Sequence, residues 1–151
     1  MYSSNEKIML QDKIFLRQTS SDIKAMLDTE KYYCQNSAFL VFSETIDLKF
    51  LLGLLNSKLI DFYYKNNNPQ EGKVFAEIKP SVIKSIPLPE YSDKQQKSII
   101  NLVDKILSAK KENSAADTSD WEREIDLLVY SLYGLSEEEI DVVEGGNNEQ
   151  P

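Results

Sequence analysis

The segment Asp47-Leu-Lys-Phe-Leu-Leu-Gly-Leu-Leu-Asn-Ser-Lys-Leu-Ile-Asp-Phe62 decides the fold, because its apolar residues recur with the period of an α-helix. The apolar positions that share one helical face are Leu48, Leu51, Leu52, Leu55, Leu59 and Phe62. Phe50 and Leu54 widen this face, which predicts a buried helix. Gly53 costs about 1 kcal/mol of helix propensity relative to Ala, so it predicts close packing against the backbone at that point.

Strands are predicted on the N-terminal side of this helix. The run Lys13-Ile-Phe-Leu-Arg-Gln-Thr19 is rich in β-branched and aromatic residues, and its side chains alternate, with Ile14 and Leu16 on one face and Phe15 and Arg17 on the other. Two further strands are predicted at Tyr32–Cys34 and Ala38–Phe42, joined by a polar turn over residues 35–37.

The helix is predicted to end in the polar loop Lys65-Asn-Asn-Asn-Pro-Gln-Glu-Gly72. Residues 74–79 then alternate in polarity, which predicts one more strand that Pro80 stops. The stretch Ile86-Pro-Leu-Pro89 must be extended, because each proline biases its predecessor away from the helical conformation. It forms a strap between two parts of the chain.

Three capping boxes predict three helices after the strap. Ser92 with Gln95 opens a helix that runs to about residue 111, and Ser119 with Glu122 opens a second helix that Gly134 closes. Ser136 with residue 139 starts a short third helix.

The predicted fold class is α+β: a small mixed β-sheet with a long buried helix, followed by a C-terminal helical annex. We expect residues 8–90 to form the α+β core. Residues 91–144 form the annex, which packs on the core or on a catalytic partner, and residues 145–151 are expected to be a disordered tail.

Composition places the chain in the cytoplasm. Charged residues interrupt every apolar run before it reaches the ~20 residues that a membrane-spanning helix needs. Residues 1–7 are polar and no apolar stretch follows them, so we expect no secretory signal. The lone cysteine, Cys34, cannot form a disulfide within the chain, which fits a reducing compartment.

The side chains that most catalytic sites need are missing. The chain has no His, which excludes Ser-His and Cys-His nucleophilic sites, and one Cys cannot build a thiolate zinc site. Its 5 glycines form no phosphate-cradling loop, so we expect no cofactor in this segment. The acidic pairs at predicted helix starts are interpreted as partners of the helix dipole. The sequence therefore favours a binding function over an independent enzyme.

The charge distribution restricts where a nucleic acid can bind. The net charge is −8, from 17 basic and 25 acidic residues. Residues 1–89 carry 11 basic and 10 acidic side chains, a net charge of +1, whereas residues 90–151 carry 6 and 15, a net charge of −9. Because phosphate neutralisation supplies most non-specific affinity, only the N-terminal part can face DNA.

Basic and amide side chains near predicted turns of the N-terminal part are suited to phosphates and base edges. These candidate DNA-binding residues are Lys13, Arg17, Gln18, Lys24, Lys31, Lys65, Asn66, Asn67, Asn68 and Lys73. The alternative interpretation is a solvated surface with an ordinary polar loop.

Several segments in order resemble the TaqI-like C-terminal specificity domain, the DNA-reading end of type II adenine-specific methyltransferases. They are the run 13–19, Asn36-Ser37 before an apolar strand, Leu51-Leu-Gly-Leu-Leu-Asn-Ser-Lys-Leu59, Ile86-Pro-Leu-Pro89 with Gln95 or Gln96, and the stretch from Glu124 to Ile140. The leucine-rich helix followed by the proline strap is also similar to the target-recognition domains of type I specificity subunits.

The resemblance covers residues 12–144 and implies a domain that binds duplex DNA sequence-specifically. It implies a methyltransferase catalytic domain as partner, in the same chain or a separate subunit, and S-adenosylmethionine in that domain. The acidic C-terminal part departs from a DNA-binding surface, so we assign it to packing. The alternative function is a helical interaction scaffold, with a homodimer through the C-terminal helices.

Overall fold

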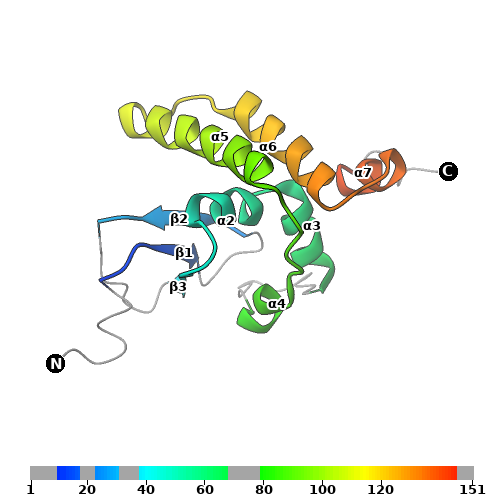
Figure 1. The fold of residues 1–151 in the computed structure, drawn as a ribbon, viewed down its shortest axis with the longest axis horizontal. Coiled ribbons are helices and arrows are strands. Elements are labelled where there is room, and N and C mark those ends of the chain that lie inside the picture. Colours follow the sequence, from blue (N-terminus) through cyan, green and yellow to red (C-terminus); the bar gives the residue numbers. More distant parts are fainter. Residues whose placement is uncertain (1–9, 18–22, 31–37, 68–78, 146–151) are drawn as a thin grey trace.

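The computed structural model describes residues 10–17, 23–30, 38–67 and 79–145 of the chain. Figure 1 shows a small sheet, a middle layer of two short helices, and an outer layer in which two longer helices lie side by side. The elements in chain order are β1 (Lys13–Arg17), β2 (Ala25–Asp28), β3 (Ala38–Val41), α2 (Leu48–Leu55), α3 (Lys58–Asn67), α4 (Pro80–Ser85), α5 (Asp93–Glu112), α6 (Ser119–Leu132) and α7 (Glu137–Val143). The predicted α+β class is confirmed.

The sheet has the order β2-β1-β3, and both pairings are antiparallel, so the expectation of a mixed sheet is wrong for the described strands. Ile14 lies opposite Leu27 and Val41, and Leu16 lies opposite Ala25 and Phe39. Since side chains alternate across a sheet, these residues form the inward face. Ile14 and Leu16 are fully or almost fully buried.

The predicted strand Tyr32–Cys34 lies outside the described residues, as do residues 74–78 of the strand predicted over 74–79 and residues 146–151 of the predicted tail. Lys79 is described, and it is the N-cap of a helix. Strands β1 and β3 lie where the sequence predicts them. Strand β2 was not predicted. It occupies the four residues Ala25–Asp28.

The long buried helix is divided into α2 and α3 at Asn56 and Ser57. The Ser57 hydroxyl donates to the Leu54 carbonyl at 2.6 Å, and the Ser57 backbone N–H donates to the same carbonyl at 3.1 Å. Ser and Asn compete with the helix for backbone partners in this way, which ends α2 and starts α3. Helix α3 continues to Asn67, so the predicted loop is wrong over residues 65–67.

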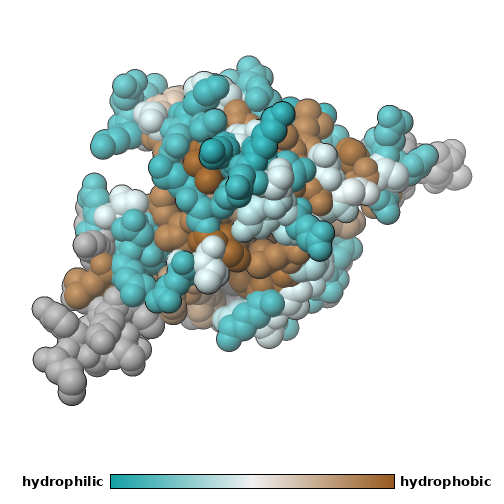
Figure 2. All heavy atoms as spheres, in the orientation of Figure 1, coloured by the Kyte–Doolittle hydropathy of each residue, from teal (hydrophilic) through white to brown (hydrophobic). Residues whose placement is uncertain are grey.

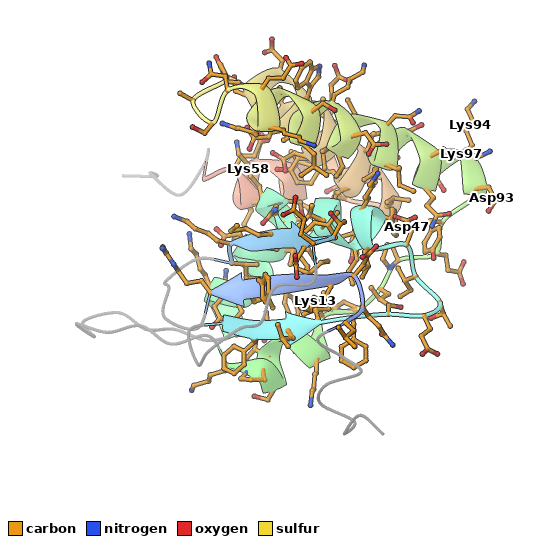
Figure 3. The ribbon with its side chains drawn as sticks, turned by 90° about the vertical axis from the view of Figure 1, so that its left-hand side faces the viewer. Lys13, Asp47, Lys58, Asp93, Lys94 and Lys97 are labelled. Carbon is orange, nitrogen blue, oxygen red and sulfur yellow. The ribbon has the colours of Figure 1, made fainter. Side chains whose placement is uncertain are left out.

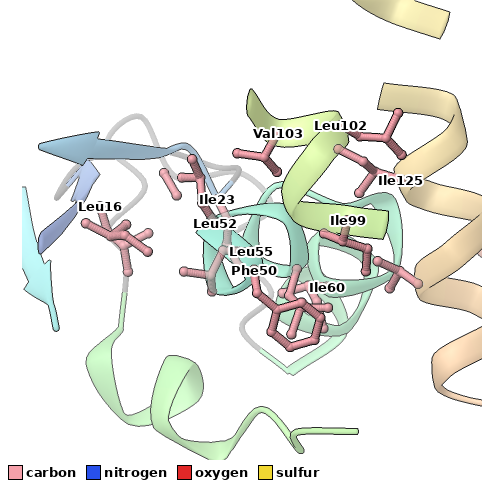
Figure 4. Close-up of a cluster of buried hydrophobic side chains, with 14 of the residues drawn as sticks. Leu16, Ile23, Phe50, Leu52, Leu55, Ile60, Ile99, Leu102, Val103 and Ile125 are labelled. Atoms are coloured by element: carbon pink, nitrogen blue, oxygen red, sulfur yellow. The ribbon is translucent and has the colours of Figure 1, made fainter. Parts of the chain in front are cut away.

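Helix α2 fills the centre of the molecule, with the sheet on one side and α5 on the other (Figure 4). The prediction of close packing at Gly53 is confirmed: a Cβ atom there would lie 2.7 Å from Cγ2 of Ile99 and 3.3 Å from Cγ2 of Val103. One cluster of buried side chains includes residues of the sheet, α2, α3, α5 and α6. The C-terminal helices therefore complete the core around α2.

The proline strap is extended, as predicted, and it follows a short helix, α4, which the sequence analysis missed. The strap is fixed at both ends. Tyr133 donates a hydrogen bond to the Pro87 carbonyl at 2.7 Å. Tyr91 packs against the buried ring of Phe50 with ring centroids 4.5 Å apart.

Two of the three predicted capping boxes are confirmed, at Ser92 with Gln95 and at Ser136 with Glu139. The third is wrong: Thr118 caps α6, and Ser119 is its first residue. Gly134 ends α6 with a φ of 67°. The N–H groups of Gly134 and Leu135 donate to the carbonyls of Ser131 and Tyr130, the pattern of a Schellman motif.

The part of the chain that the structure describes has no helix long and apolar enough to cross a bilayer.

Candidate nucleic-acid interface

Two of the predicted DNA-binding residues, Arg17 and Lys24, lie side by side at one end of the sheet. The backbone N–H of Arg17 donates to the Lys24 carbonyl at 3.5 Å, which continues the β1–β2 ladder by one residue pair. Both residues are exposed. Antiparallel pairing therefore brings together two cations that are seven positions apart in the sequence.

Helix α3 brings a third cation to the same place. The carboxylate of Asp61 accepts the backbone N–H of Ile23, the neighbour of Lys24, at 3.4 Å through Oδ1. Its other oxygen forms an ion pair with Lys65 Nζ at 2.8 Å, in which both side chains are partly exposed. We call the group formed by Arg17, Lys24 and Lys65 the basic end.

The predicted amides Asn66 and Asn67 follow Lys65 in the last turn of α3, where both are exposed. Their Nδ2 groups donate to the carbonyls of Phe62 and Tyr63, each at 2.8 Å. These bonds orient the two side chains along the helix, so they are held on the C-terminal turn instead of moving in a loop. The Oδ1 atoms do not take part in these two bonds.

Lys13 does not belong to the interface. Its side chain is fully buried and forms an ion pair with Asp28 at 2.6 Å, opposite it on β2. The ammonium group also lies 5.4 Å from the centre of the Phe15 ring. A buried cation that is neutralised in this way is unsuited to contacting phosphates, and we correct its assignment to a structural one.

The remaining predicted residues, Gln18, Lys31, Asn68 and Lys73, lie outside the described residues. The basic end thus contains the predicted cations of the described chain apart from Lys13.

Sequence reasoning missed the residues that hold the basic end in place. Asn56, at the C-cap of α2, accepts the N–H of Ala25 at 2.9 Å and donates to the carbonyl of the same residue at 3.0 Å. Asp61 holds Ile23, as described above. A polar residue at a helix break was the available signal for Asn56, but its partner on β2 could not be inferred while β2 itself was unrecognised.

Of the other exposed cations, Lys94 and Lys97 lie elsewhere, whereas Lys58 lies at the α2–α3 junction, two residues after Asn56. Figure 3 shows Lys94 and Lys97 near the start of α5, on the side away from the end of the β1 arrow, and Lys58 between the sheet and the outer helices. The backbone N–H of Lys58 donates to Oδ1 of Asp126 at 2.9 Å. Burial raises the pKa of the Asp126 carboxyl, and this hydrogen bond opposes the rise.

A second polar group ties α6 to α7. Arg123 pairs with Glu144, and the Tyr130 hydroxyl donates to the same carboxylate at 3.2 Å. Burial raises the pKa of the Tyr130 hydroxyl, which keeps the hydroxyl protonated. These residues join the two helices. In the described ranges, no three His, Cys, Asp or Glu side chains gather as metal ligands would.

The molecule also has an apolar groove of about 430 Å³ between β3, α2, α4 and the strap. Its lining is almost wholly apolar, with Lys84 as the charged side chain. Figure 2 shows hydrophilic residues over the outer helices and hydrophobic residues gathered in the band below them. A groove of this composition lacks the donors that phosphate recognition needs, so the basic end is the better candidate for nucleic acid.

Comparison with solved structures shows a shared fold. The chain matches part of the Type IIL restriction-modification enzyme MmeI, solved in complex with DNA, with a TM-score of 0.70 over 90% of this chain and 17% sequence identity. The chain covers 20% of the length of that enzyme. The chain therefore shares the fold of one part of that enzyme.

The TaqI-like C-terminal specificity domain family matches residues 2–88, more than half of the chain. The chain belongs to this family, as the resemblance of its segments indicated. The matched residues contain the three strands, α2, α3 and the whole basic end. No curated protein sequence matches the chain.

Proposed function

We propose that this chain is the DNA target-recognition domain of a restriction-modification methyltransferase, and that it reads the target sequence while another part of the enzyme performs the chemistry. The observation that carries the proposal is the family match, because the matched residues include every described member of the basic end. The fold shared with an enzyme solved on DNA agrees with it.

The basic end supplies the chemistry for DNA contact. Its Lys side chains suit phosphates, and Arg17 can contact a phosphate or bond to a guanine edge through two donors. Asn66 and Asn67, beside Lys65, carry the amides that pair with adenine edges. The hydrogen bond that Asp61 accepts from the N–H of Ile23 fixes the strand end relative to α3 before DNA arrives, so less conformational freedom is lost on binding.

The outer helices α5 and α6 are separated from the strands of this surface, and Asp126 of α6 reaches it at the α2–α3 junction through the N–H of Lys58. Helix α2 separates the sheet from α5, and the outer layer that α5 and α6 form lies beyond it (Figure 1). The acidic residues of α5 and α6 are therefore mostly placed across α2 from the sheet. In this proposal the helical annex, residues 91–144, braces the core and contacts the rest of the enzyme.

The methyl transfer belongs to another domain, one that turns the target adenine out of the duplex. In this proposal S-adenosylmethionine binds in that other domain: of the described glycines, Gly53 faces side chains of α5, and Gly134 and Gly145 end helices. None of these glycines opens a loop toward a ligand. A DNA-reading domain of this kind works in the cytoplasm, where fractionation of expressing cells should find it.

The experiment is selection of duplexes from a random library by the purified chain, followed by sequencing and anisotropy titration of the enriched duplex. We expect one enriched motif, and we expect Arg17→Ala to weaken its binding or relax one position of it. Lys97→Ala, an exposed cation at the other end of the molecule, is the matched control. A library that emerges without enrichment would refute sequence recognition by this chain.

A second experiment tests the role inside the enzyme. Residues 12–89 are exchanged for those of a related domain in the restriction-modification enzyme that contains them, and the methylated motif is determined by methylome sequencing. The motif should change with the exchanged segment. An active chimera that methylates the original motif would leave the segment a scaffold.

The alternative function, a helical interaction scaffold, is weakened by where the helix stripes lie. Ile99 and Val103 of α5 and Ile125 and Val129 of α6 are buried within the chain itself. A homodimer through these helices would have to use outward side chains such as Leu127, whose exposed fraction is 49%. Sedimentation of wild type and Leu127→Asp tests it, and a monomeric wild type at high concentration excludes it.

A further inference from the structure

We propose that Lys24 is a phosphate anchor of the DNA interface and that Asn56 is its positioning residue. The inference rests on the proposed function and names a specific contact within it. It follows from the way in which three consecutive residues, Ile23, Lys24 and Ala25, are held.

The backbone around Lys24 is fixed by four hydrogen bonds from three different elements. Asp61 of α3 accepts the N–H of Ile23 at 3.4 Å, and Arg17 of β1 donates to the Lys24 carbonyl at 3.5 Å. Asn56 bonds both backbone groups of Ala25, at 2.9 and 3.0 Å. The residues on both sides of Lys24 are therefore held by side chains of the middle helical layer.

The side chains of the same three residues alternate between core and solvent. Ile23 and Ala25 are 6% and 8% exposed and belong to the hydrophobic core, whereas Lys24 is exposed. An ammonium group on a backbone held in this way keeps its position at lower entropic cost than one on a loop. Lys65, the other lysine of the basic end, differs because it forms an ion pair with Asp61.

The chemistry of lysine favours a phosphate over a base. Its ammonium is a compact point charge without the planar fork that reads a guanine edge, and phosphate contacts are those that fix a protein in register on the duplex. A cation whose backbone is fixed meets this need. Arg17, its neighbour across the ladder, retains the fork for a base edge.

The two bonds from Asn56 reproduce those of a neighbouring strand. An amide carries one donor and one acceptor side by side, as a backbone peptide does, and Ala25 lies on β2, at the edge of the described sheet. Asn56 is itself exposed, so water can satisfy Ala25 when the amide is removed. The backbone groups of Ala25 thus do not depend on these two bonds for hydrogen-bond partners. The bonds are suited to holding the strand end in one position.

The test is a double-mutant cycle of DNA affinity, measured by anisotropy on the enriched duplex. The salt concentration is varied from about 0.05 M to about 0.5 M, which is wide enough to resolve the slope that counterion release produces. Lys24→Ala should reduce the slope of log K against log salt by about 0.9, which corresponds to roughly eightfold weaker binding at about 0.1 M salt, with an unchanged motif. Asn56→Ala should weaken binding when Lys24 is present and have no further effect in the Lys24→Ala background.

The controls separate positioning from folding. Lys97→Ala removes an exposed cation at the other end, and Asn101→Ala removes an exposed amide of α5; both should bind as wild type does. If Asn56→Ala unfolds, Asn56→Asp repeats the cycle, because it keeps an acceptor for the N–H of Ala25. An equal loss from the Asn56 variant in both backgrounds would show a general structural role and overturn the positioning.

The outcomes also separate this inference from the proposed function. A wild-type chain that binds no DNA overturns both. A wild-type chain that binds its motif while Lys24→Ala keeps the full salt slope overturns the phosphate anchor alone.

Discussion

Replacing Gly53 by Ala should destabilise the protein, although Ala is the better helix former. An added Cβ would lie 2.7 Å from Cγ2 of Ile99 and 3.3 Å from Cγ2 of Val103. Both are β-branched residues of α5 held close to their own backbone, so they cannot rotate away as the end of a long side chain does. Overpacking of this kind costs about 1–3 kcal/mol.

The gain from helix propensity opposes this cost. Gly→Ala in a helix interior contributes about 1 kcal/mol, so we expect a net loss of about 1 kcal/mol in the free energy of unfolding. Urea denaturation measures it as a lower midpoint at constant m-value. Ser108→Ala, an exposed position of α5, is the control for helix propensity without a steric conflict.

A double-mutant cycle with Ile99→Ala tests whether the contact with Ile99 causes this loss of stability. The methyl group at position 53 and the methyl groups lost from Ile99 compete for the same space, so the double variant should be more stable than the sum of the two single changes predicts. A Gly53→Ala variant that is stabilised by about 1 kcal/mol, with additive behaviour in the cycle, would refute the close contact between α2 and α5.

Three further predictions concern charge and backbone conformation. Lys13→Ala removes the ammonium that lies 2.6 Å from the carboxylate of Asp28, whose side chain is 4% exposed, and should cost about 3–5 kcal/mol in urea unfolding; a loss below about 1 kcal/mol would contradict the burial of this ion pair. Burial raises the pKa of the Asp126 carboxyl in the folded state, so the folded protein binds this proton more tightly than the unfolded chain does. The resulting stabilisation is complete below the ordinary pKa of 3.8 and is lost as the pH rises through the raised pKa. Asp126→Asn can still accept the N–H of Lys58, so its stability relative to wild type should increase from about pH 4 to about pH 7 in urea titrations, and a difference independent of pH would contradict the shift. Gly134→Ala forces a φ of 67° on a side-chain-bearing residue and should lower the free energy of unfolding by about 1–2 kcal/mol, whereas an unchanged thermal midpoint would show that the helix end rearranges.

The elements predicted correctly are those whose local signals and tertiary roles agree. The stripe of α2, the capping boxes of α5 and α7, and the closing Gly134 each follow from residues within a few positions of one another. Strand β2 shows the opposite case. Ile23, Ala25 and Leu27 do alternate with polar or outward residues, but Lys, Ala, Met and Leu are good helix formers, and four residues are too short for the pattern to dominate.

Helix α4 was missed for a different reason. Pro80 stops a strand, and it was interpreted only in that sense, although proline is also favoured in the first turn of a helix because its missing N–H has no partner there in any case. The structure shows the second role. Proline is thus compatible with the end of a strand and with the start of a helix, and the sequence alone did not distinguish the two.

The candidate site depended on partners that composition cannot reveal. Lys13 and Arg17 are four residues apart on β1, so alternation places both on the same side of the strand and does not distinguish them. The roles of the two side chains differ because the antiparallel register places Asp28 opposite Lys13, whereas Arg17 pairs through its backbone with Lys24. A candidate list drawn from charge could therefore propose both residues, but only knowledge of β2 could separate them.

The break between α2 and α3 likewise depends on partners that are distant in the sequence. It links the two halves of the molecule. In one continuous helix, the N–H of Lys58 would bond to the carbonyl of Leu54, four residues earlier. That carbonyl instead accepts the hydroxyl and the N–H of Ser57, and the freed N–H of Lys58 donates to the carboxylate of Asp126, which is only 6% exposed.

The buried carboxylate of α6 thus requires the break, because without it Asp126 would lose its donor. On its other side, the same junction presents Asn56 to β2, where it holds Ala25 beside Lys24. The leucine pattern favours one long helix, and the polar residues within it favour two short ones whose junction contacts the acidic helices and the basic end. A substitution at Ser57 should therefore disturb DNA affinity and the packing of α6 together, whereas one at Lys24 should disturb affinity alone.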